Sequence, residues 1–150
     1  MSDDSDLIKL YSQRILALAA DIPYLDRLEA PMGAARKRAP LCGSTVSVDV
    51  NVTEGRVSAF GQDVKACALG QAAASVVGAN VIGRSRDELQ TARDQLLAML
   101  NEDGPAPSAP FDGLEVLIPA RSYRNRHASI LLCLEATLAA FDAAESIACA

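Results

Sequence analysis

The chain has 150 residues, of which 50% are apolar and 22% are charged. This length and composition are typical of a single globular domain over residues 1–150, and they exclude an intrinsically disordered chain. The 19 acidic residues outnumber the 14 basic ones, and the net charge of −5 argues against nucleic acid as a partner. The sequence has neither an apolar run long enough to span a membrane nor a basic signal peptide, so we expect a cytoplasmic protein without a membrane partner.

The N-terminal part predicts one helix followed by an irregular connection. Apolar side chains recur at spacings of three and four residues, as on one face of a helix that ends near Asp21: Ile8, Tyr11, Ile15 and Leu18. Residues 22–43 contain several prolines and no sustained period, so we expect a connection with only short local structure.

The next segment predicts an antiparallel hairpin. Residues 45–52 read TVSVDVNV, and this alternation of valine with polar residues is typical of a half-buried strand. Glu54 and Gly55 supply a turn, and a β-prone run follows at 57–60. A short third strand is expected at 62–65.

Three helices are expected in the remainder of the chain. The small residues of 66–78 favour a helix that other backbones can approach closely. Ser85 and Glu88 match the S-x-x-E capping box of a helix that reaches about residue 100, and a proline-rich loop follows at 103–110. The last helix begins near residue 124, and one face of it carries His127, Leu131, Leu134, Leu138 and Phe141. This order predicts an α+β fold with helices packed over a small antiparallel sheet of two or three strands.

The four cysteines and the single histidine are the candidates for a metal site. The chain has no C-x-x-C motif and no export signal, so we expect free thiols and a site that only the fold can assemble. Cys42 lies in a loop before the first predicted strand. Cys67 lies at the start of the small-residue helix, where the helix dipole favours a thiolate, and His127 lies in the first turn of the last helix. These three side chains could converge at one end of the sheet as a Cys2His site.

Each of these residues also has a purely structural interpretation. A single cysteine among alanines, such as Cys67, is most often a small buried side chain. A single histidine on an apolar face, such as His127, is most often a hydrogen-bonded core residue. Cys133 lies about 240° around the helix from His127, so we expect it to pack in the core, and we expect Cys149 to be a thiol of a frayed terminus.

Several stretches carry a recognisable pattern. PLCGSTVSVDV is similar to P-x-C-G-D before a hairpin, and VKACALGQAAAS is similar to G-C-A or G-C-G before an Ala/Ser-rich helix. Gly83-Arg84-Ser85 with Glu88 is similar to G-K-S-x-x-E, and the HASIL of 127–131 is similar to H-C-S-I-L. Over most of its length the chain therefore resembles the iron–sulfur assembly scaffolds of the IscU, SufU and NifU N-terminal family. The resemblance implies a three-stranded antiparallel sheet packed against helices in one domain.

The resemblance places Cys42 and Cys67 on the first two cluster-ligand cysteines of that family. Ala128 replaces the third cysteine, and His127 falls on the histidine that precedes it. An alternative alignment with the R-x-K-C of SufU places His127 on the cysteine itself. Ser44 replaces the family aspartate. Because the third cysteine of the IscU branch accepts persulfide sulfur, its replacement argues against the same route here.

The resemblance implies a scaffold or carrier, without enzymatic turnover, that binds iron or a [2Fe-2S] cluster through Cys42, Cys67 and His127. A fourth ligand would come from solvent, a partner, or a side chain such as Ser44 or Asp63. The implied partners are a cysteine desulfurase and apo iron–sulfur acceptor proteins, and we expect a monomer or weak homodimer. Two alternatives stay open: zinc at the same Cys2His set, in a sulfur-transfer or regulatory role, and a metal-free interaction module.

Overall fold

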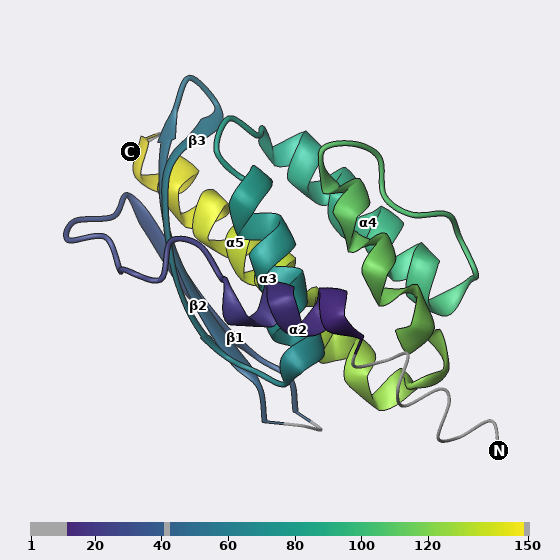
Figure 1. Ribbon diagram of the computed structural model, residues 1–150. Helices are drawn as coiled ribbons and strands as arrows, with labels where there is room; N and C mark the ends of the chain where they lie inside the picture. The colour runs from purple at the N-terminus through teal and green to yellow at the C-terminus, as the bar shows by residue number, and fades with distance from the viewer. Residues whose placement is uncertain (1–11, 41–42, 149–150) are drawn as a thin grey trace, which may run out of the picture.

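Nine helices and strands can be followed in the computed structural model, which describes residues 12–40 and 43–148. In chain order they are the helix α2 (Gln13–Ala20), the strands β1 (Gly33–Arg38), β2 (Thr45–Thr53) and β3 (Arg56–Lys65), the helices α3 (Ala68–Asn80) and α4 (Arg86–Asn101), the 3-10 helices η1 (Phe111–Ser122) and η2 (Arg124–Arg126), and the helix α5 (His127–Ala148). The helices gather on one face of the sheet, and α5 lies directly against the strands (Figure 1). The predicted α+β fold is confirmed.

The sheet has three antiparallel strands, with β2 in the centre. The valines of β2 at 46, 48 and 50 are buried beneath the helices, whereas the residues between them face the other side of the sheet. Alternate side chains of a strand lie on opposite faces, so the TVSVDVNV pattern is the direct cause of this arrangement. The predicted hairpin is confirmed, and the runs predicted separately at 57–60 and 62–65 form the single strand β3.

The third strand of the sheet is β1, which comes before the hairpin. The prediction of an irregular connection over 22–43 is therefore wrong for residues 33–38. The sequence GAARKR shows no alternation, and alanine and lysine are not strand-forming residues. β1 pairs with β2 along its whole length, and a Cβ atom at Gly33 would overlap the carbonyl oxygen of Ala140 in α5. Pairing and close packing thus form this strand in spite of its local sequence.

Where the structure describes them, the helix ends lie within three residues of the predicted ones, and Ile8 and Tyr11 of the first predicted helix lie outside the described residues. α3 has Cys67 as its N-cap residue, and α4 begins with the predicted capping box, in which the Ser85 hydroxyl accepts from the Glu88 N–H and the Glu88 carboxylate accepts from the Ser85 N–H. The predicted apolar face of α5 is buried, and so are residues on its other faces, including Cys133, Ala136 and Ala140. α5 contacts β1, β2, α3 and α4, so it is the central helix of the core.

The chain between α4 and α5 contains one element that the sequence did not reveal. The proline-rich loop at 103–110 is confirmed, but η1 follows it and buries Phe111, Leu114 and Leu117 against α3 and α4. Its backbone turns through Pro119, which excludes a regular α-helical pattern. No helix within the described ranges is long and apolar enough to cross a lipid bilayer.

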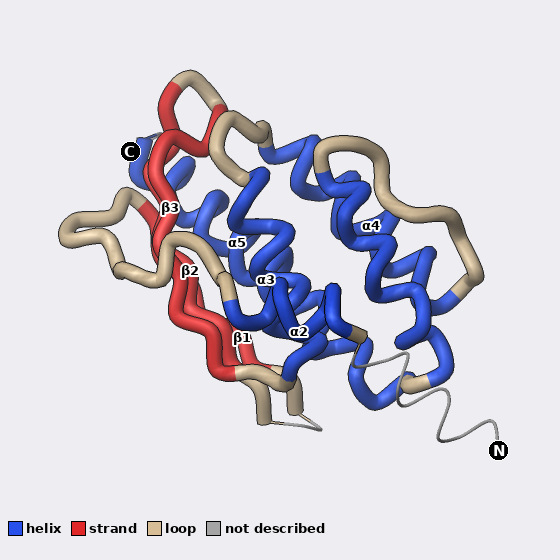
Figure 2. The backbone as a smooth tube through the Cα atoms, viewed as in Figure 1, coloured by secondary structure: helices blue, strands red, loops and turns tan. Residues whose placement is uncertain are grey.

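The loop 21–32 covers part of the sheet face that the helices leave open. The Arg27 guanidinium donates two hydrogen bonds, of 2.6 and 2.8 Å, to the buried carboxylate of Asp49, and the Leu28 N–H donates a third of 3.1 Å. The backbone at Asp26 lies directly over Gly61, where a Cβ atom would not fit. Figure 2 shows this loop in tan, where it projects from the sheet on the side away from the helices.

Candidate metal centre

Cys67 lies at the junction between β3 and α3, as the N-cap residue of that helix. Only Ala66 separates it from the end of β3, so it is placed at the end of the sheet where β2 begins. Its side chain is half-buried. The first N–H groups of a helix have no partner within the helix, and the helix dipole favours negative charge at that end. The predicted position of Cys67 at a helix N-terminus is confirmed.

The surroundings of Cys67 stabilise its thiolate. Burial raises the pKa of the thiol, but hydrogen bonds oppose this effect and the pKa lies below its ordinary value. The groups that donate toward the sulfur are the N–H of Gly70, the hydroxyl of Ser129, the N–H of Leu69 and the guanidinium of Arg126. A thiolate of this kind is a ready ligand for a soft metal ion.

Two buried serines connect Cys67 with the loop between β1 and β2. The Sγ atom of Cys67 lies 3.6 Å from the Ser129 Oγ, and the Ser129 hydroxyl lies 3.0 Å from the Ser44 Oγ. Ser129 belongs to α5 and Ser44 immediately precedes β2, so the chain of hydroxyl groups joins three segments that are distant in the sequence. Ser44, which the resemblance aligns with an aspartate, supplies a neutral hydroxyl group here.

Cys42 lies outside the described residues. The residues on either side of it are joined by two backbone hydrogen bonds. The Ala39 N–H donates to the Ser44 carbonyl at 2.8 Å, and the Gly43 N–H donates to the Ala39 carbonyl at 2.9 Å. Gly43 has a φ of +70°, a conformation that glycine adopts without strain. The role of Cys42 as a ligand stays a prediction.

His127 is buried, and both nitrogens of its ring have partners. Nδ1 lies 2.8 Å from the Asn101 Oδ1, and Nε2 lies 3.0 Å from the carbonyl oxygen of Ala120, to which it donates. His127 precedes Ser129 by two residues, which corresponds to about 200° around α5, so its ring leaves the helix on a different side from the hydroxyl that faces Cys67. A ligand role for the imidazole would require at least one of these two hydrogen bonds to break, because a metal ion binds a single ring nitrogen.

The remaining candidates have different surroundings. Cys133 is buried, its thiol donates to the Gln62 Oε1 at 3.4 Å, and burial raises its pKa to about 12, so its predicted packing role is confirmed. Asp63 is exposed on β3, and Cys149 lies outside the described residues. Within 12–40 and 43–148, no group of three or more His, Cys, Asp or Glu side chains is arranged to hold a metal ion.

Two residues of this site were not predicted from the sequence. Ser129 in the first turn of α5 and Arg126 at the end of η2 both lower the pKa of the Cys67 thiol, from about sixty residues away in the chain. The available signal was a polar residue, Ser129, within the otherwise apolar start of the last helix. The site as described is thus one stabilised thiolate with hydrogen-bond donors on two sides, next to the loop that carries a second cysteine.

Comparison with solved structures places this arrangement in a known group. The N-terminal part of a nitrogen-fixing NifU-like protein from Brucella abortus has a TM-score of 0.91 and 41% identity, over 94% of this chain and 98% of that one. A protein of Fervidobacterium islandicum AW-1, described as an iron–sulfur cluster assembly scaffold for the SUF system, has a TM-score of 0.71 and 16% identity, over 89% and 98%. A hypothetical protein shares the fold, with a TM-score of 0.75 and 19% identity over 90% and 98%.

No protein-family model matches the sequence, and none of the curated proteins matches it either. The resemblance seen in the cysteine-containing stretches nevertheless agrees with the structural neighbours. With 41% identity over nearly the whole of both chains, this protein belongs to the NifU-like family and corresponds to the N-terminal part of such a protein.

Proposed function

We propose that this protein is a carrier or scaffold that receives iron or a [2Fe-2S] cluster at the Cys67 end of the molecule and passes it to apo-proteins. Its role is to hold and release this cargo, without an enzymatic turnover of its own. Family membership supports the role in cluster assembly. The observation that carries the proposal for this chain is the Cys67 thiol, whose pKa is lowered at a helix N-terminus beside Ser129 and Arg126.

The proposed ligands are Cys42, Cys67 and His127. The two cysteines match the residue type that iron–sulfur clusters require, and imidazole replaces thiolate on one iron of some clusters. One ring nitrogen of His127 would have to give up its hydrogen bond, to Asn101 or to Ala120, before it could bind iron. Its ligand role is therefore the part of the proposal that needs the most direct test.

The proposed partners are apo iron–sulfur proteins as recipients and a cysteine desulfurase as the source of sulfur. Ala128 stands where the IscU branch carries its sulfur-accepting cysteine, so sulfur would have to reach Cys42 or Cys67 instead. Cys67 follows the end of β3 that pairs with the start of β2, and Ser44, next to that start, is hydrogen-bonded to the end of the segment that follows β1.

Anaerobic reconstitution with ferrous iron and sulfide tests the carrier role. We expect the wild-type protein to hold iron and sulfide and to absorb visible light, because thiolate-to-iron charge transfer colours such clusters. Cys67→Ser should lose most of the bound iron, whereas Cys133→Ser should keep it, because the Cys133 thiol is buried in the core and hydrogen-bonded to Gln62. A colourless protein that retains zinc after purification from metal-replete medium would contradict the proposal and favour the zinc alternative.

A matched pair of variants tests His127. If the imidazole binds iron, His127→Ala should change the visible spectrum of the reconstituted protein, and Asn101→Ala should leave that spectrum unchanged. If the ring only holds α4, η1 and α5 together, both variants should lower the melting temperature and neither should alter the spectrum. The second result would remove His127 from the ligands.

A further inference from the structure

The basic side chains of this protein are divided into paired and unpaired groups. Seven of the described ones form ion pairs with acids: Arg14, Arg27, Arg56, Arg84, Arg86, Arg93 and Arg121. The other six form no ion pair with any described residue: Arg36, Lys37, Arg38, Lys65, Arg124 and Arg126. Five of these six surround the end of the molecule that carries Cys67, and we call the five, without Lys37, the basic face.

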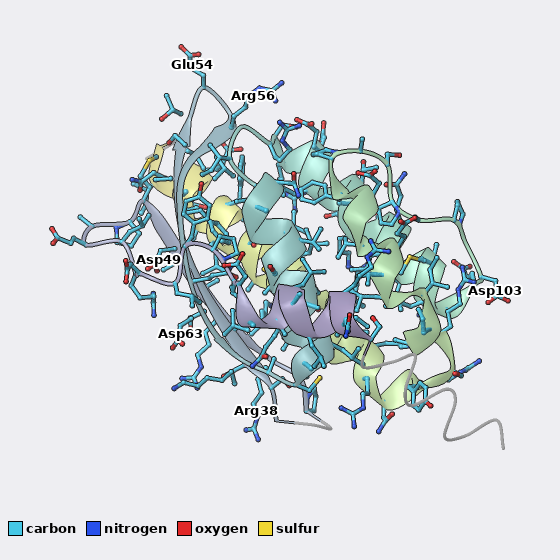
Figure 3. All side chains as sticks on the ribbon, viewed as in Figure 1. Arg38, Asp49, Glu54, Arg56, Asp63 and Asp103 are labelled. Atoms are coloured by element: carbon cyan, nitrogen blue, oxygen red, sulfur yellow. The ribbon has the colours of Figure 1, made fainter. Side chains whose placement is uncertain are left out.

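The strand register places three members of the basic face on the side of the sheet that faces away from the helices. Arg38 and Lys65 lie on either side of Thr45 in the last outward row of the sheet, and Arg36 belongs to the next outward row. All three are exposed. Figure 3 shows Arg38 and Arg56 at opposite ends of the sheet, and Arg56 is paired with Glu88.

The other two members come from the segment that leads into α5. Arg126 helps to lower the pKa of the Cys67 thiol, and Arg124 is exposed in the same short 3-10 helix, η2. Lys65 precedes Cys67 by two residues. The basic face therefore adjoins the Cys67 thiol on two sides. Lys37 points toward the helices, where it lines a surface cavity with Glu135 and Asp142.

The charge of this surface is not explained by folding. Two acids lie on the side of the sheet that faces away from the helices. Asp63 is in the same row of paired residues as Arg36, and the carboxylate of Asp49 is already neutralised by Arg27. Five cations on one surface repel one another, and they do so in a chain whose net charge is −5. Acids of the described ranges form ion pairs with other basic residues but with none of these five. Such an arrangement is typical of a surface that meets a complementary charge on a partner.

We propose that the basic face docks an acidic surface of a partner protein against the Cys67 end of the molecule. The partner would carry carboxylates around the group that gives or takes the cargo, so that association brings this group to Cys67. The identity of the cargo rests on the function proposed above, but the docking itself does not require bound iron. Nucleic acid is the less favoured polyanion, because the rest of this chain is acidic and would repel a long phosphate backbone.

The test uses the metal-free full-length protein and an acidic plant-type ferredoxin in its apo form as the probe. Binding is titrated at about 20 mM and about 200 mM salt, since screening weakens contacts between exposed charges. We expect wild-type affinity to fall at least about tenfold at the higher salt. The triple variant Arg36→Gln, Arg38→Gln, Lys65→Gln should bind at least about tenfold more weakly than wild type at low salt.

A second triple variant controls for net charge. Ala79→Glu, Thr91→Glu and Ser146→Glu lower the charge by the same three units at exposed positions of α3, α4 and α5, away from the basic face. This control should bind within about twofold of wild type at the higher salt, where only contacts near the interface persist. Circular dichroism and melting temperature establish that both triple variants are folded.

Four results would overturn the proposal. The first two are that wild type does not bind apo-ferredoxin at low salt, and that the two triple variants lose the same amount of affinity for it. The other two are that salt does not change the wild-type affinity, and that wild type binds duplex DNA more tightly than apo-ferredoxin. Reconstitution of the same variants separates this proposal from the carrier role. Wild-type protein that docks as expected but holds no iron would refute the carrier role and leave the docking face in place.

Discussion

The Cys67 thiol is half-buried, and burial alone would raise its pKa and suppress the thiolate. The helix N-terminus, Ser129 and Arg126 reverse this tendency. When Cys67 is a thiolate, the Ser129 hydroxyl must donate its hydrogen to the sulfur. The Ser44 hydroxyl, whose oxygen lies 3.0 Å from the Ser129 Oγ, can then donate its hydrogen to the Ser129 oxygen. The reactivity of this residue therefore depends on two serines as well as on its position in α3.

Ser129→Ala should raise the pKa of the Cys67 thiol, because it removes a hydrogen bond that stabilises the thiolate. At any pH below that pKa a smaller fraction is then ionised, so alkylation of Cys67 by iodoacetamide should be slower by about two- to tenfold near pH 7. The rate is measured as a function of pH, with mass spectrometry of the peptide that contains Cys67.

Ser129→Thr is the matched control, because it keeps the hydroxyl group. Its pH profile should stay close to that of the wild-type protein. An unchanged profile in Ser129→Ala would show that Ser129 packs against Gly70 without acting on the sulfur.

At the same scale, the sequence located Cys67 correctly but not its partners. The change from strand-forming to small residues at Ala66 marks the start of a helix. A residue at the start of a helix lies at the positive end of the helix dipole, whatever the rest of the fold. Ser129 contacts Cys67 only because α3 and α5 pack side by side. The direction of the His127 ring depends in the same way on Asn101 and Ala120, which are neighbours in space only.

Among the elements, the loop 21–32 is held on the sheet by several hydrogen bonds, of which those to the buried carboxylate of Asp49 can be tested by pH. The hydrogen bonds from Arg27 lower the pKa of Asp49 despite its burial, and the Leu28 N–H adds to this effect. Asp49 thus ionises more readily in the folded protein than in the unfolded chain. Its contribution to stability is complete above the unfolded pKa of about 4 and is lost as the pH falls through the lower folded pKa.

Asp49→Asn should lower the free energy of unfolding by about 1–3 kcal/mol at pH 7, because it weakens a charge-assisted pair. Below about pH 4 the difference from wild type should shrink, since the wild-type carboxyl is then protonated as well. Denaturant unfolding between pH 7 and pH 3 measures both effects.

Asp26→Asn serves as the control for this loop, because Asp26 is exposed and forms no ion pair within the described chain. It should change stability by less than about 0.5 kcal/mol at every pH. A constant difference between Asp49→Asn and wild type across the pH range would be at odds with a titrating Asp49.

Elements with strong local patterns were predictable, and the others were not. The valine alternation of β2 and the capping box of α4 act within a few residues, so their sequence determines them. β1 exists because β2 pairs with it and α5 accepts Gly33 at close range, and η1 forms where Phe111 and Leu114 reach the core. Neither cause is visible in a short window of sequence.

For the whole molecule, α5 is the element on which the others depend. It packs against both β1 and β2 and against the helices α3 and α4, whereas α2 packs mainly on α3. Regions that share many buried contacts open only when the whole domain unfolds. The stability of α5 should therefore equal that of the complete fold.

Amide hydrogen exchange should show this difference directly. The amides in the middle of α5 should exchange most slowly, with an opening free energy close to that of global unfolding, and those of α2 and of the 103–110 loop should exchange faster. Mass spectrometry of peptic fragments measures the rates. Faster exchange in the middle of α5 than in α2 would refute a core organised around α5.

Cys133 has a practical consequence for solution work on this protein. Its sulfur is enclosed by the core and bonded to Gln62, with a pKa near 12, so reagents that modify thiols will reach it only when the core opens. Cys67 is accessible in the native state. A thiol count taken under native conditions and repeated in denaturant thus contains an internal gauge of unfolding, which needs neither a fluorescent tryptophan, absent from this chain, nor an added label.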